Sequence, residues 1–261
     1  MPIVDKHAHG SPCWFELGTT DQSGAKSFYT ALFGWSAADF PMGPEEVYTM
    51  LKTDGHDVGG AYTLNAQMKE QGVPPHWMVY FAVPDADAAA ATVSALGGTV
   101  LMAPFDVMTF GRMAVCKDPT GAVFSIWQAK DHKGVGVFGE NNTIGWAELA
   151  TRDVNAAEAF YKALFPWETA PSAGSPTPYI EFGPAGQKTG GLMQMDGQWE
   201  GIPPHWGVYF RVDDCDAAAA KIKELGGQVC FGPFDAGGVG RIAVGADPQG
   251  ANFSIIRLNP H

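Results

Sequence analysis

The second half of this 261-residue chain repeats the first half. Trp14 and Glu16 recur as Trp146 and Glu148, an offset of 132 residues. Further along, the offset falls to 129, because PPHW at 74–77 recurs at 203–206. Two short loop deletions account for this drift. Self-similarity over half of a chain indicates two copies of one structural unit. We therefore predict one domain at 10–129, a linker at 130–142 and a second domain at 143–258.

Hydrophobic spacing within each copy predicts mixed secondary structure. Thr20 or Asp21 is expected to cap a helix, because Phe28, Tyr29 and Leu32 follow a 3.6-residue period. A second, alanine-rich helix starts after Asp85 and ends at a glycine pair. Short β-branched and aromatic runs predict strands between and after these helices. Each copy thus contains a strand, a helix and further strands, twice over, and the fold class is α+β.

The charge balance excludes several kinds of partner. The chain has 28 acidic against 16 basic residues, a formal net charge of −12, so phosphate backbones and anionic lipid surfaces are repelled. We expect no nucleic-acid partner and no membrane span, because no apolar run approaches the roughly 18 residues that a span needs. The first ten residues lack a secretory apolar stretch, and none of the four cysteines recurs between the copies. A cytoplasmic location is expected.

Several motifs together resemble the vicinal oxygen chelate superfamily, which includes glyoxalase I, bleomycin-resistance proteins, fosfomycin-resistance enzymes and extradiol dioxygenases. They are FYxxLFGW at 28–35, the helix PDADAAAATVSALGG and the DPxG turn before the last strand. The openings PCWFELGTTD and GWAELATRD are similar to a tandem-repeat, glyoxalase-like subgroup that includes a mycobacterial antigen. The resemblance implies two tandem domains, four βαβββ modules and curled sheets whose concave faces form cups. It also implies an internal pseudo-dimer, which as a whole is either a monomer or a homodimer.

The resemblance further implies where metal ligands would stand. Counted from the family's landmarks, the eight positions carry no carboxylate or imidazole: they are Trp14, Ala61, Met78, Ser125, Trp146, Leu192, Gly207 and Ser254. A divalent metal needs several oxygen, nitrogen or thiolate donors. We therefore expect no cofactor and no metal at the usual site. Displaced ligands form a minority alternative, because Glu16, His76, Glu148 and His205 lie two residues from these positions and face the same side of their strands.

The cups instead present aromatic side chains with a few polar groups, which is typical of sites for small organic ligands. The predicted ligand-binding residues are Trp14, Tyr80, Trp127, Trp146, Tyr209 and Arg211. Glycine at 207, where the first copy has Met78, and the cation of Arg211 favour the second cup for an anionic ligand. The outward-facing Phe81 and Phe124 are expected to pack under helices.

Three functions remain open from the sequence. The leading hypothesis is a metal-independent protein that binds a small, partly aromatic organic molecule, either as a binding or resistance protein or as an enzyme. The first alternative is a metal-dependent glyoxalase-like lyase or dioxygenase that uses Glu16, His76, Glu148 and His205, which are also the candidate catalytic residues. The second alternative is a non-catalytic interaction protein. The sequence leaves open whether the chain is a catalyst.

Overall fold

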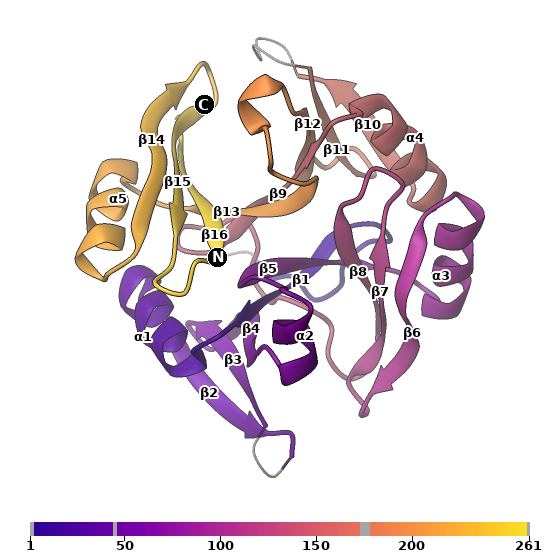
Figure 1. Cartoon of the computed structure of the whole chain (residues 1–261), viewed down its shortest axis with the longest axis horizontal. Coiled ribbons are helices and arrows are strands. Elements are labelled where there is room, and N and C mark those ends of the chain that lie inside the picture. The colour runs from indigo at the N-terminus through magenta and orange to yellow at the C-terminus, as the bar shows by residue number, and fades with distance from the viewer. Residues whose placement is uncertain (1–2, 44–45, 173–177, 260–261) are drawn as a thin grey trace.

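The computed structural model describes residues 3–43, 46–172 and 178–259. Its strands form two eight-stranded sheets, and each sheet is built from one copy of the repeat. The strand order is β2-β3-β4-β1-β5-β8-β7-β6 in the first sheet and β10-β11-β12-β9-β13-β16-β15-β14 in the second. Figure 1 shows the two copies side by side, with α1 next to α5 and α3 next to α4. This arrangement confirms the predicted fold class of two tandem α+β units.

The first copy contains eight strands and three helices in the described residues. They are β1 (Pro12–Thr19), α1 (Gln22–Phe33), β2 (Ser36–Pro41), β3 (Val47–Thr53), β4 (His56–Thr63), α2 (Ala66–Glu70), β5 (His76–Ala82), α3 (Ala86–Ala95), β6 (Thr99–Val107), β7 (Gly111–Lys117) and β8 (Val123–Ala129). The short α2 is absent from the sequence prediction, because its five residues bury no side chain and so carry no apolar period.

The second copy repeats this order with one change. Its elements are β9 (Ile144–Thr151), α4 (Val154–Leu164), β10 (Trp167–Pro171), β11 (Tyr179–Pro184), β12 (Gly190–Gln194), η1 (Gly197–Trp199), β13 (His205–Arg211), α5 (Cys215–Glu224), β14 (Gln228–Ala236), β15 (Gly240–Ala246) and β16 (Asn252–Leu258). The 3₁₀ turn η1 stands where the first copy has α2. Among the described residues, no helix has the length and apolar character needed to cross a membrane.

Aspartates cap the helices that the sequence predicted. The Asp21 carboxylate accepts a hydrogen bond from the backbone N–H of Gly24, and Asp85 accepts one from Ala88. Such caps satisfy N–H groups that have no partner within the first helical turn. Helix α1 ends at Gly34, whose φ of 74° is the left-handed conformation that glycine adopts readily. Of the two predicted caps, the structure therefore selects Asp21.

The aromatic core between the copies is formed by their convex sheet faces. Phe81 packs against Phe165 at 5.2 Å and Trp206 at 5.0 Å, and Phe124 packs against Tyr161 at 5.4 Å between ring centroids. Phe81 and Phe124 therefore lie under a helix, as predicted. That helix is α4, which belongs to the other copy. The concave faces are left to form the cups.

A reciprocal pair of hydrogen bonds joins the two copies inside this core. Tyr29 of α1 donates to the carboxylate of Asp247 at 3.2 Å, and Tyr161 of α4 donates to that of Asp118 at 2.8 Å. Each tyrosine thus bonds the DPxG turn of the opposite copy. Trp206 in turn donates its indole N–H to the Tyr161 hydroxyl at 2.9 Å.

Candidate functional site

Strand pairing fixes which side chains face the first cup. In β1 and β5, Trp14 lies opposite Tyr80 and Glu16 lies opposite Met78. Tyr80 in turn pairs with Ser125, which continues the same face onto β8. The inward positions predicted on these three strands therefore share one face, which is the concave one.

One predicted position lies on the wrong face. Ala61 pairs with Leu17 and Thr49, which belong to the buried convex side, whereas Gly60 pairs with Glu16 and faces the cup. The second copy has the same arrangement, because Leu192 pairs with Leu149 and Gly191 with Glu148. The family landmark was thus misplaced by one residue, and a one-residue shift in a strand reverses the side-chain direction. Glycine at the corrected position also supplies no ligand atom.

Glu16 sits at the base of the first cup with both carboxylate oxygens hydrogen-bonded. Tyr48 donates to Oε1 at 2.7 Å, and Tyr80 donates to Oε2 at 2.6 Å. The indole N–H of Trp14 donates to the Tyr48 hydroxyl at 3.0 Å. We call these four residues the Glu16 network. It joins strands β1, β3 and β5 through side chains alone.

The second copy contains the same arrangement, which we call the Glu148 network. Tyr179 donates to Glu148 Oε2 at 2.8 Å, Tyr209 donates to Oε1 at 2.7 Å, and Trp146 donates to the Tyr179 hydroxyl at 2.8 Å. Trp146, Glu148 and Tyr209, which the sequence proposed separately, thus meet at one point.

Burial controls the protonation of both networks. Removal from water raises the pKa of Glu16, and the hydrogen bonds from Tyr80 and Tyr48 oppose that rise only in part. The pKa of Glu148 is raised for the same reason and opposed by Tyr209 and Tyr179. Burial also raises the pKa of the four tyrosines well above its usual value, so their hydroxyls remain donors.

Sequence reasoning missed Tyr48 and Tyr179, which complete the networks. Their hydroxyls lie above glycines: a Cβ added to Gly60 would stand 2.1 Å from Tyr48 Oη, and one added to Gly191 would stand 2.1 Å from Tyr179 Oη. The repeat carries a signal for this, because both tyrosines and both glycines recur together at an offset of 131. Nothing in the sequence shows that these strands are neighbours, however, and the signal is visible only once they are paired.

Above the Glu16 network lies a cavity of about 390 Å³. Its walls are mainly aromatic and sulfur-containing: Trp14, Phe40, Met42, Met50, Tyr80, Met108, Phe110, Met113 and Trp127. Glu16 and Tyr48 supply the polar base. The predicted ligand-binding residues of the first copy, Trp14, Tyr80 and Trp127, all line this cavity.

Three polar residues, Lys52, Asp57 and His132, form one side of the same cavity. The Lys52 ammonium lies 2.7 Å from Asp57 Oδ1, and His132 Nε2 lies 3.4 Å from Asp57 Oδ2. His132 comes from the predicted linker, and its ring meets that of Trp14 edge-on at 4.6 Å. Trp127 donates its indole N–H to the His132 carbonyl at 3.1 Å. The linker thus becomes part of the cavity wall, which the sequence did not indicate.

The walls of the second cup differ although its network is the same. By the strand registers, Glu181 replaces Met50, Gly183 replaces Lys52 and Ile256 replaces Trp127. Glu181 accepts a hydrogen bond from Ser172 at 3.3 Å and pairs with Lys188. Around the Glu148 network, polar and aliphatic side chains therefore stand where the first cup has methionine and tryptophan.

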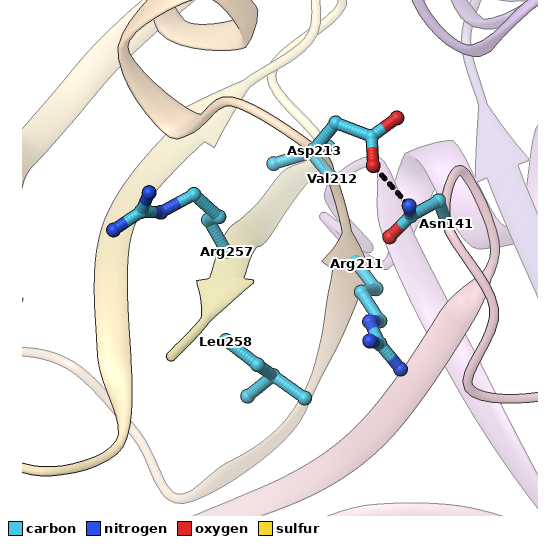
Figure 2. Close-up of a pocket in the computed structure, with 6 residues that line it drawn as sticks. All are labelled: Asn141, Arg211, Val212, Asp213, Arg257 and Leu258. Atoms are coloured by element: carbon cyan, nitrogen blue, oxygen red, sulfur yellow. Dashed lines mark hydrogen bonds between the residues drawn. The ribbon is translucent and has the colours of Figure 1, made fainter. Parts of the chain in front are cut away.

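Arg211 lies apart from the Glu148 network. It lines a smaller pocket of about 230 Å³ with Asn141, Asp213 and Arg257, at the ends of β13 and β16. Figure 2 shows the guanidinium groups of Arg211 and Arg257 extending away from each other. Arg211 donates to the carbonyl of Gly139 at 2.8 Å, while Asn141 donates to Asp213. The arginines thus do not converge on one anion.

The two PPHW histidines hold loops. The Nδ1 atom of His76 lies 2.8 Å from the carbonyl oxygen of Pro74, and that of His205 lies 2.9 Å from the carbonyl oxygen of Pro203. Burial lowers the pKa of His76, which favours its neutral form. Neither histidine forms a hydrogen bond or ion pair with the carboxylate in its cup, so the candidate Glu–His pairs are not assembled in either copy.

The cup residues do not fit a divalent metal. Both oxygens of Glu16 are engaged by tyrosine hydroxyls, and the cup-facing neighbours Met78 and Ser125 add neither carboxylate nor imidazole. The carboxylate of Asp57, on the cavity wall, is paired with Lys52 and His132. Within residues 3–43, 46–172 and 178–259, no three His, Cys, Asp or Glu side chains converge as a metal site would require. We therefore derive no chemistry through a metal.

Comparisons with known proteins place the chain among related sequences and folds. A family model described as Glyoxalase/Bleomycin resistance protein/Dioxygenase superfamily matches residues 13–126 and 143–255. The chain is 42% identical to a protein of Mycobacterium tuberculosis named "Putative glyoxylase CFP32", covering 100% of this chain and 99% of the relative. It is 38% identical to the anthracycline biosynthesis protein DnrV of Streptomyces peucetius, covering 98% and 96%.

Two solved structures share the fold at low identity. The Mn(II)-bound glyoxalase from Novosphingobium aromaticivorans superposes with a TM-score of 0.67 at 15% identity, over 95% of this chain and 82% of that one. The 2,3-dioxygenase LapB from Pseudomonas sp. KL28 gives a TM-score of 0.67 at 13% identity, over 98% and 95%. At such identities the likeness concerns the fold alone.

Proposed function

This chain belongs to the glyoxalase/bleomycin resistance protein/dioxygenase superfamily, and we propose that its first cup binds a small, partly aromatic organic molecule without a metal. The observation that carries this proposal is the 390 Å³ cavity, which is lined by aromatic rings and methionines and closed at its base by Glu16 and two tyrosines. Ligand pockets of a few hundred Å³ with apolar walls and few polar groups are typical of small-molecule sites.

The cavity walls suit a flat ring system. Trp14, Tyr80 and Trp127 offer ring surfaces for stacked or edge-on contacts. Methionine adapts its shape to a ligand and makes favourable contacts with aromatic rings. The relative DnrV is named for anthracycline biosynthesis, and anthracyclines contain fused aromatic rings, which agrees with a ligand of this class. The proposed role is binding, whether the bound molecule is then sequestered or transformed.

Thermal unfolding in the presence of 2-naphthol and 1,2-dihydroxyanthraquinone tests this proposal. A ligand at a hundredfold excess over its Kd stabilises the folded state by about 2.7 kcal/mol, which raises the Tm by several degrees. We expect such a rise with at least one compound.

Two matched variants locate the site. Met113→Trp places a bulky indole ring in the first cavity, and Ile242→Trp places one at the equivalent position of β15. We expect Met113→Trp to abolish the rise and Ile242→Trp to retain it. The proposal is contradicted if neither compound shifts the Tm, or if only Ile242→Trp abolishes the shift.

A further inference from the structure

Every hydrogen-bond proton of the Glu16 network is donated to another member of the network. Tyr80 and Tyr48 donate to the Glu16 carboxylate, and Trp14 donates to the Tyr48 hydroxyl. Tyrosine has one O–H donor and the indole one N–H, so with the carboxylate ionised no donor in the network is left for a ligand. The remaining capacity consists of lone pairs on the Glu16 and tyrosine oxygens. With Glu16 ionised, the base of the cavity therefore accepts hydrogen bonds and offers none.

The Glu16 carboxylate also has no cationic partner among the described residues. In the described part of the chain, no Lys, Arg or His lies within ion-pair distance of its carboxylate, and the Lys52 ammonium is paired with Asp57 at 2.7 Å. A partly buried carboxylate without a cation is costly unless a ligand brings one. The rings of Trp14, Tyr80 and Trp127 beside it add attraction of the cation–π kind.

We propose that the first cavity recognises an alkylamine that carries an aromatic ring system, in its protonated form, with the ammonium group donating to the Glu16 network and the ring system lying between the aromatic walls. This inference rests on the proposed function and adds the charge of the ligand. A carboxylate or phosphate ligand would meet the negative charge of Glu16 and no free donor at the base of the cavity. A neutral alcohol of the same shape can donate one hydrogen bond but cannot neutralise Glu16.

A series of matched probes tests the charge preference in the wild-type protein. Isothermal titration calorimetry at pH 7 compares 2-naphthylmethylamine, which is cationic, with 2-naphthylmethanol and 2-naphthoate. We expect the Kd of the amine to be at least about tenfold lower than that of the alcohol. We expect the carboxylate to bind most weakly. Equal affinity for amine and alcohol overturns this inference but leaves the proposed function standing. Absence of binding by all three probes contradicts both.

Removing the charge should remove the preference. Glu16→Gln keeps the size of the side chain but not its charge, and we expect the amine and the alcohol to bind this variant within about threefold of each other. Glu148→Gln removes the same charge from the equivalent network of the second copy and serves as the matched control. We expect it to retain the preference at the first site. A preference for the amine that persists in Glu16→Gln, with the variant folded by circular dichroism, overturns the assignment.

Discussion

Glu16 and Glu148 are single residues whose environment determines how the protein responds to pH. Each is half-buried at the base of its cup, and each is bonded to two tyrosine hydroxyls. Burial raises the pKa of both carboxyl groups, with Tyr hydrogen bonds opposing it. In the unfolded chain a glutamate titrates near pH 4.3, about its unperturbed value. Above that pH the folded protein therefore binds more protons at these sites than the unfolded chain does.

This difference predicts how stability changes with pH. When the native state binds more protons, the free energy of unfolding falls as pH rises from about 4.3 through the raised folded pKa. The double variant Glu16→Gln/Glu148→Gln lacks these two carboxyl groups. It should therefore not show the part of this fall in the free energy of unfolding that comes from them. Urea unfolding at pH 5 and pH 8 measures this difference. We expect the free energy of unfolding of the double variant, minus that of the wild type, to be larger at pH 8 than at pH 5. A difference that is the same at both pH values would contradict the assigned pKa direction.

The sequence was informative about single residues on β1, β5 and β8 and less so elsewhere. Trp14, Glu16 and Tyr80 could be placed on one face because strand side chains alternate with a period of two. Tyr48 could not be connected to Glu16, since the pairing of β3 with β4 and of β4 with β1 depends on long-range contacts. His132 was assigned to a linker, because only tertiary packing brings that segment against Trp14.

At the scale of elements, α1 and α4 connect the copies. Each helix presents a tyrosine to the DPxG turn of the other copy, and each turn receives the hydroxyl through a buried aspartate. Asp118 also accepts hydrogen bonds from the backbone N–H groups of Thr120, Gly121 and Ala122. The helix and the turn were both predicted from the sequence, but their contact across the copies was not, since each motif is local.

Removal of one of these hydroxyls should weaken the contact. Tyr161→Phe deletes the donor to Asp118 and also the acceptor for the Trp206 indole. Leaving buried polar groups without partners costs about 1–3 kcal/mol each. Chemical denaturation should therefore show a loss of at least ~1 kcal/mol in the free energy of unfolding. Tyr62→Phe, at a half-buried tyrosine outside this contact, is the control and should change it by less. An equal effect of both variants would show that the inter-copy bond contributes no stability.

At the scale of the whole molecule, duplication has produced two cups with the same base and different walls. The Glu16 and Glu148 networks match bond for bond, whereas Met50, Lys52 and Trp127 are replaced by Glu181, Gly183 and Ile256. The repeat itself, the two-domain organisation and the superfamily could be predicted from the sequence, because they rest on motif order. The cavity could not, because its walls combine residues from all eight strands of the first sheet, two loops and the linker.

A crystal structure of the protein with 2-naphthylmethylamine bound tests the central claim most directly. We predict electron density for the naphthyl ring in the first cavity, between Trp14, Tyr80 and Trp127, with the amine nitrogen within hydrogen-bond distance of a Glu16 or tyrosine oxygen. Density for the compound only outside this cavity would contradict the account. So would a metal ion bound to Glu16 in its place.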